Sequence, residues 1–102
     1  MSACLRVPMD LVIRVIEIKG HCAVYEVGDV FRLEEGYRVI TDIPLCMHSL
    51  SSIIPYYNAL QVSEPTRWGL AGTKDSTKAY VQCLDAYPYT GGGTAIFEIS
   101  KE

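Results

Sequence analysis

Five short segments of this chain have the residue types and the alternation that predict β-strands. The first, residues 11–19 ("LVIRVIEIK"), is rich in Val and Ile, and both of its alternating faces are largely apolar. This pattern predicts a strand that is covered on two sides. The four other strands are expected at residues 30–33, 37–40, 79–85 and 94–100. Turn residues such as Gly28-Asp29 and Glu34-Glu35-Gly36 separate them.

Residues 42–61, "DIPLCMHSLSSIIPYYNALQ", predict one main helix. Apolar residues recur there at helical spacing, so that one face should pack on a sheet; they are Leu50, Ile53, Ile54, Tyr57 and Leu60. Asp42 suits the N-cap position, and Pro44 suits the first turn, where its missing N–H is not needed. Pro55 lies inside the pattern and removes a backbone hydrogen bond, which predicts a kink or a split near residues 51–52.

Strands and helix are grouped by type along the chain instead of alternating. This grouping predicts an α+β fold, with a small antiparallel or mixed sheet of about five strands and one main, Pro-kinked helix packed on it. With 102 residues, 49% of them hydrophobic, the chain has room for one domain. We place this domain at residues 10–102, after an N-terminal arm at residues 1–9. Because so small a domain has a narrow margin of stability, self-association would add to it, and we expect a homo-oligomer.

The charge pattern excludes two classes of partner. The formal net charge is −3, and the nine Lys and Arg residues are dispersed without a basic stripe, which argues against nucleic acid. The longest apolar run, residues 11–18, is interrupted by Arg14 and Glu17, so it is too short and too charged to cross a membrane or to serve as a signal peptide. We therefore expect a cytoplasmic protein, whose four cysteines are reduced thiols or metal ligands.

Four segments resemble, in their order, a family of small prokaryotic proteins of about this length; they are "GHCAVYEVGDVF", "LCMHSLSSIIPYYNAL", "KAYVQCLD" and "PYTGGGTAIFEI". The family pattern runs Cys-Pro-x-x-x-x-Gly-Asp, then Leu-Cys near a helix start with a later Pro, then Gln-Cys-x-Asp, then a glycine-rich turn before a final strand. The resemblance covers most of the chain from Leu11 onward. It implies no established activity.

The resemblance also implies that three cysteines, Cys22, Cys46 and Cys83, occupy the family's recurring cysteine positions. The chain departs from the pattern at two places. Ala23 stands where the family usually has Pro, and Leu84 stands where a Pro often precedes the Asp. These departures should alter local turns and leave the sulfur atoms in place.

The cysteines allow a metal site as one interpretation. Cys22, Cys46 and Cys83, joined by His48 or His21, could form a tetrahedral site for zinc, with iron as the other candidate. The chain contains no Cys-x-x-Cys pair. Cys46 and His48 are two residues apart, so on a regular helix their side chains point about 200° from one another. Such a site would therefore require the three cysteines to converge through the tertiary structure.

Two other interpretations of Cys46 stay open. As a catalytic residue it would be a reactive thiolate at a helix N-terminus, with His48 as its base. As a structural residue it would pack in the core, because free cysteine behaves as a small hydrophobe and Cys46 shares a helical row with Leu50 and Ile53. The sequence favours core packing and leaves all three interpretations standing.

The stretch "YTGGGT" and its neighbours supply the ligand-binding candidates, which are Tyr87, Tyr89, Gly91, Gly92 and Gly93. A phosphate-binding loop would need a Lys after the glycines and then a helix, whereas here no Lys follows and a strand is expected. We interpret the glycines as a flexible hairpin connection. The two tyrosines could wall a small-molecule pocket or a subunit interface.

From the sequence we therefore expect a small cytoplasmic binding or accessory domain that self-associates and takes a partner protein or a small molecule; the sequence assigns it no cofactor and leaves zinc or iron possible. The alternative is a small metal- or thiol-dependent enzyme that uses Cys22, Cys46 and Cys83. In that alternative Cys46 and His48 would be the catalytic residues, and zinc or iron would be the metal.

Overall fold

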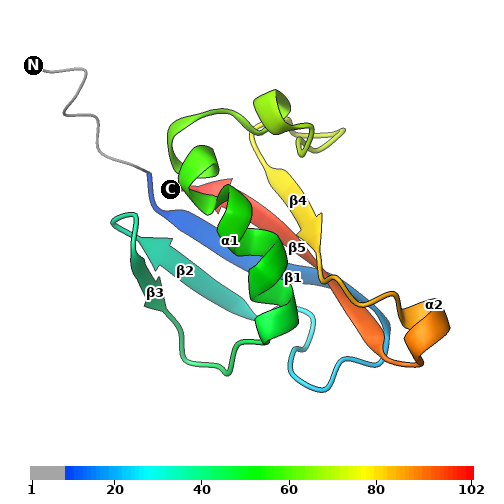
Figure 1. Cartoon of the computed structure of the whole chain (residues 1–102). Helices are drawn as coiled ribbons and strands as arrows, with labels where there is room; N and C mark the ends of the chain where they lie inside the picture. Colours follow the sequence, from blue (N-terminus) through cyan, green and yellow to red (C-terminus); the bar gives the residue numbers. More distant parts are fainter. Residues whose placement is uncertain (1–8) are drawn as a thin grey trace, which may run out of the picture.

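A computed structural model describes residues 9–102, which form a five-stranded sheet with one main helix across one face (Figure 1). The strands are β1 (Leu11–Gly20), β2 (Val30–Glu34), β3 (Arg38–Ile40), β4 (Ala79–Gln82) and β5 (Gly93–Lys101). Their order in the sheet is β3-β2-β1-β5-β4, and all neighbours are antiparallel. The helical elements are α1 (Met47–Val62), the 3-10 helix η2 (Pro65–Trp68) and the single turn α2 (Tyr87–Thr90). The predicted α+β fold is confirmed, with an antiparallel sheet.

Residues 1–8 of the expected N-terminal arm lie outside the described residues. Met9, the last residue of that arm, is already attached to the domain, because its N–H donates a hydrogen bond to the Gln61 carbonyl oxygen at 3.0 Å. This bond joins the last residue of the predicted arm to the C-terminal part of α1.

Strand β1 lies at the centre of the sheet and changes its register along its length. Leu11, Ile13 and Val15 are buried on the face that carries α1. A β-bulge between Val15 and Glu17 inserts one extra residue, after which Ile18 is the residue opposite buried Ala95. Such an insertion moves the following side chains to the other face of the strand. The bulge thus allows one strand to supply the core with both odd and even positions.

The opposite face of the sheet is open to solvent in the described structure. Arg14 on β1 is exposed, and its partner Val30 on β2 is 36% exposed. The prediction that β1 is covered on two sides is therefore wrong. The prediction failed because Val12 makes the outer face look apolar in the sequence, although no second layer formed by residues 9–102 covers that face.

Helix α1 begins later than predicted and runs without a break. Its N-cap residue is Cys46, so the assignment of Asp42 as N-cap is wrong. Pro55 lies inside a continuous helix, so the expected split does not occur. Pro55 and Ser51 are both exposed, so water can satisfy the Ser51 carbonyl that loses its hydrogen bond. Among residues 9–102 no helix has the length and the apolar composition that crossing a membrane would need.

The buried face of α1 differs from the predicted one. Ile53 and Leu60 are buried, and Tyr57 packs beside them, as expected. Ile54, however, is 56% exposed, and Leu50 is only half-buried. The predicted apolar row was therefore too wide, because α1 turns only part of it toward the sheet.

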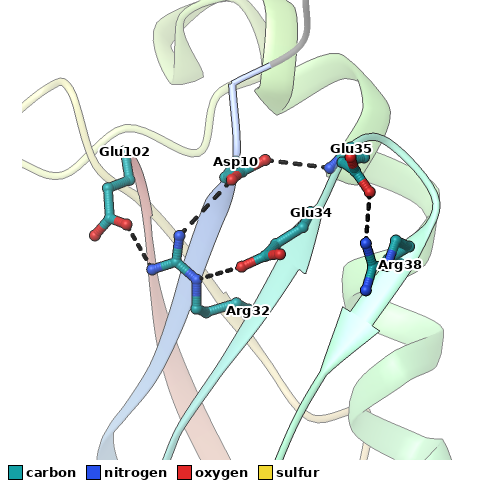
Figure 2. A network of polar contacts seen from close by, with 6 residues as sticks. All are labelled: Asp10, Arg32, Glu34, Glu35, Arg38 and Glu102. Carbon is teal, nitrogen blue, oxygen red and sulfur yellow. Dashed lines mark hydrogen bonds and ion pairs between the residues drawn. The ribbon is translucent and has the colours of Figure 1, made fainter.

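The β2–β3 hairpin is held in place by a network of polar contacts. Figure 2 shows its members, which are Asp10, Arg32, Glu34, Glu35, Arg38 and Glu102. The guanidinium of Arg32 contacts Glu34 at 2.9 Å, Glu102 at 2.6 Å and Asp10 at 3.8 Å. At the turn, Arg38 pairs with Glu35 at 2.8 Å, and the Glu35 N–H donates to Asp10 at 3.1 Å. The network connects the hairpin to the start of β1 and to the C-terminal residue.

Candidate binding site

The structure does not gather the three cysteines into one site. Cys22 lies in the loop after β1, where its sulfur accepts a hydrogen bond from the Tyr25 N–H at 3.3 Å. Cys46 is the residue before α1, and both of these cysteines are half-buried against the core. Cys83 follows β4 and is only 7% exposed. In the part of the chain that the structure describes, no group of three or more His, Cys, Asp or Glu side chains is arranged to hold a metal ion.

The two histidines do not complete a thiol site either. His48 lies one residue inside α1 and is exposed, whereas the Cys46 side chain packs against the core. The divergence expected from their two-residue spacing is therefore present. His21 is also exposed, although the neighbouring Cys22 is half-buried. Both imidazoles are therefore at the surface, whereas the side chains of Cys22 and Cys46 pack against the core.

The side chain of Tyr25 lies at the start of α1, beside the backbone of Cys46. Its hydroxyl oxygen accepts the Cys46 N–H at 2.9 Å and lies 2.7 Å from Ser49 Oγ. Ser49 Oγ in turn donates to the Cys46 carbonyl oxygen at 2.7 Å, so the Tyr25 hydroxyl donates to Ser49. This closed ring satisfies both backbone groups of Cys46 at the start of α1 without using the Cys46 sulfur.

Tyr25 is buried and packs against a second aromatic ring. Its ring is 3% exposed and stacks edge-on against Phe97, with centroids 5.5 Å apart. Burial raises the pKa of the Tyr25 phenol, so the phenol stays protonated and can keep donating to Ser49. A tyrosine 21 residues before Cys46 carries no local signal for this role, which is why the sequence did not reveal it.

The glycine-rich segment has a structural explanation. α2 ends at Gly91, whose φ of 77° lies in the left-handed region that glycine favours. A Cβ on Gly93 would lie 2.4 Å from the His21 carbonyl oxygen, and one on Gly92 would lie 2.6 Å from the Asp85 carboxylate. Gly93 is therefore needed for the close approach of backbone where β1 ends and β5 begins, and a side chain at Gly92 would displace the Asp85 carboxylate. The two glycines form a tight connection instead of the flexible one that we expected.

The two tyrosines of this segment lie in different surroundings. Tyr87 is half-buried and packs against Gly20, because a Cβ on Gly20 would lie 2.9 Å from the Tyr87 ring. Tyr89 is 92% exposed. The structure therefore does not bring the two rings together as the walls of one pocket.

A cleft of about 230 Å³ lies between α1 and the β2–β3 hairpin, and we call it the α1–β3 cleft. Its lining residues are Leu33, Tyr37, Arg38, Val39, Leu50, Ile53, Ile54 and Tyr57. Most of these side chains are apolar, and several are open to solvent. Val39 is 49% exposed, and Tyr37 is more exposed still. Among the described residues that line the cleft, Arg38 is the one that carries a charge, and it pairs with Glu35 outside the cleft.

The cleft exists because one helix cannot cover five strands. Strands spaced about 4.8 Å apart make a five-stranded sheet about 19 Å wide, whereas a helix is about 10–12 Å across. α1 packs on β1, β4 and β5. In Figure 1, β3 and the arrowhead of β2 lie to the left of α1 with no described helix in front of them. The layer that residues 9–102 place over the sheet is thus incomplete over the hairpin.

A comparison of the chain with family models, with curated proteins and with solved structures found no match. The family resemblance of the four sequence segments therefore stays a prediction.

Proposed function

We propose that this protein is a binding module that holds bulky apolar groups of a partner in the α1–β3 cleft. The observation that supports the proposal is the apolar lining of a half-open cleft of about 230 Å³. An apolar protein cavity of about 150 Å³ can hold a benzene ring. The α1–β3 cleft is therefore large enough for one aromatic group or for two smaller aliphatic side chains.

The energetics favour binding at this position. Tyr37, Val39 and Ile54 are all partly exposed at the rim of the cleft. Covering a large apolar side chain completely stabilises a complex by about 1.5–3 kcal/mol. Part of this binding free energy is lost because both partners lose freedom of motion when they associate. A ligand that covers these three residues should bind with modest affinity.

The enzyme alternative has less support from the geometry. A thiolate mechanism would need a base beside Cys46, whereas His48 is exposed and the backbone of Cys46 is held by Tyr25 and Ser49. A metal mechanism would need three converging ligands, which residues 9–102 do not provide. We therefore prefer binding to catalysis.

Titration with isobutylbenzene, observed by NMR, tests the cleft. We expect saturable shifts of the Val39, Ile53 and Ile54 signals, because these residues line the cleft. Ile54→Asp should weaken binding about tenfold or more, since a carboxylate in an apolar site must lose its hydration. Val27→Asp is the matched control, because Val27 is 62% exposed and lies in the loop between β1 and β2. Shifts that do not saturate, or equal binding by both variants, would contradict the proposal.

We also propose that the protein self-associates through the open face of the sheet, in the cytoplasm. Val30 and Ile40 are 36% and 38% exposed, and their cross-strand partners Arg14 and Arg32 mark them as members of that face. Exposed apolar groups on an uncovered sheet face favour a symmetric interface. The free thiols of Cys22, Cys46 and Cys83 support a reducing compartment.

Sedimentation at tens of micromolar protein tests self-association. We expect a species heavier than the 11.3 kDa monomer, and Val30→Asp should shift it toward the monomer. The same variant should still bind isobutylbenzene, because Val30 does not line the cleft. A single species near 11.3 kDa for the parent protein would remove the proposal.

A further inference from the structure

Strand β3 presents a free edge beside the α1–β3 cleft. It is the first strand in the sheet order and pairs only with β2. All three of its residues, Arg38, Val39 and Ile40, are exposed. On its outer side the backbone N–H and C=O groups have no strand partner within residues 9–102, and Figure 1 shows β3 at the margin of the sheet. Such an edge can pair with an extended chain.

The cleft follows this same edge. Val39 pairs with Leu33, and directly opposite residues of an antiparallel pair lie on the same face of the sheet. Both residues line the cleft, on the side that carries α1. A chain added beside β3 would therefore turn alternate side chains toward α1, next to Val39 and Ile54. Successive residues on that side are about 7 Å apart, so a short segment can place two of them in the cleft.

Contacts with other parts of the protein hold the hairpin turn at the end of this edge. The hairpin turn is attached to β1 through the bond from Glu35 to Asp10, as Figure 2 shows. The turn also contacts α1, because Asn58 Nδ2 lies 3.5 Å from the Gly36 carbonyl oxygen. Pre-ordering lowers the entropy that binding must overcome. The groove between β3 and α1 therefore needs little rearrangement to accept a strand.

Charge indicates which kind of chain fits. The network of Figure 2 contains four carboxylates and two guanidinium groups, so the hairpin end has an excess of negative charge. A second copy of β3 in antiparallel pairing would bring its own Asp42, two residues after Ile40, toward this acidic end. Like charges placed together oppose that pairing. A basic residue at one end of the incoming segment would be attracted instead.

We propose that the protein recognises an extended peptide segment that adds to β3 as a sixth strand. The segment carries two bulky apolar residues at alternate positions, which enter the α1–β3 cleft, and a Lys or Arg that lies beside the hairpin turn. This inference rests on the proposed function, because the same cleft holds the apolar side chains. It adds backbone pairing with β3 and a defined partner chemistry.

Capped hexapeptides of sequence Thr-Leu-Thr-Leu-Thr-Lys provide the test. In a strand pair, the N–H groups of alternate residues point toward the neighbouring strand. One peptide is N-methylated at both Leu residues and another at the second and third Thr. We expect one of the two to bind about tenfold more weakly or worse than the unmodified peptide, as the loss of two hydrogen bonds predicts, and the other to bind nearly as well. Equal effects of the two modifications would overturn strand addition.

Three further measurements identify the site and the partner. The unmodified peptide should protect outward-facing amides of β3 from hydrogen exchange, and it should bind more weakly to Ile54→Asp than to Val27→Asp. Replacing the peptide Lys by Glu should reduce the affinity, and the reduction should be larger at low salt than at high salt. Protection of β3 amides that rises with protein concentration in the absence of peptide would show that a second copy pairs there, and would overturn the inference.

The outcomes separate the two proposals. Binding of isobutylbenzene to the cleft without binding of any hexapeptide would overturn the peptide inference and leave the proposed function standing. Failure of both ligands would overturn the proposed function as well.

Discussion

Replacement of Ile53 by alanine should lower the free energy of unfolding by about 2–5 kcal/mol. The same replacement at Ile54 should cost less than about 1 kcal/mol. The two residues are adjacent in α1 and chemically identical, but Ile53 is 0% exposed and Ile54 is 56% exposed. Truncation at Ile53 leaves a cavity against the sheet, whereas truncation at Ile54 removes methyl groups that already contact water. Urea denaturation followed by circular dichroism measures both values.

The pair controls for helix propensity, because each variant exchanges Ile for Ala inside the same helix. Ile54→Ala should also weaken isobutylbenzene binding, since Ile54 lines the α1–β3 cleft. Similar losses of stability in the two variants would show that the buried face of α1 is assigned wrongly.

Tyr25→Phe should lower the free energy of unfolding by about 1–3 kcal/mol, because a buried donor and a buried acceptor lose their partner. The affected groups are the Cys46 N–H and Ser49 Oγ, at the start of α1. The control is Tyr89→Phe, which removes a hydroxyl from a residue that is 92% exposed and should be nearly neutral. Equal melting temperatures of the two variants would mean that the ring of hydrogen bonds does not stabilise the start of the helix.

The pKa shift of Tyr25 gives this variant a pH signature. Burial raises the pKa of the phenol in the folded protein above its unfolded value of about 10. The contribution of the protonated Tyr25 phenol to the free energy of unfolding is therefore fully present below a pH of about 10. It is lost as the pH rises through the folded-state pKa. The stability difference between the parent protein and Tyr25→Phe should shrink over that range. Denaturation at several alkaline pH values measures it, and a constant difference would contradict the assignment.

The strands and turns could be predicted because their signals are local. Alternation of apolar residues located all five strands, and Glu35-Gly36 located the hairpin turn, where both residues have positive φ. The helix start could not be predicted in the same way. Asp42 and Pro44 are good local candidates, but the tertiary contact of Tyr25 with Cys46 places the start at Met47.

The candidate site was harder to predict than the fold. Cys46 and His48 were candidates because their side chains are chemically reactive. In the structure the backbone of Cys46 forms hydrogen bonds with Tyr25 and Ser49, and His48 is exposed to solvent. The α1–β3 cleft was missed because Leu50 and Ile54 have the spacing of core residues. Periodicity reports which residues share a helical face and does not report how much of that face a sheet can cover.

By itself the sequence determined the strand segments, the turns between them, the α+β class and the existence of one long helix, because these depend on neighbours within a few residues. Only the tertiary structure decided where α1 lies on the sheet, which of its apolar residues are buried, and that Cys22, Cys46 and Cys83 form no metal-holding group within residues 9–102. The physical reason is geometric: a single helix covers about half the width of five strands. Which half it covers depends on contacts between residues far apart in the chain, such as Tyr25 with Ser49 and Phe97, and that choice leaves β3 and its cleft open.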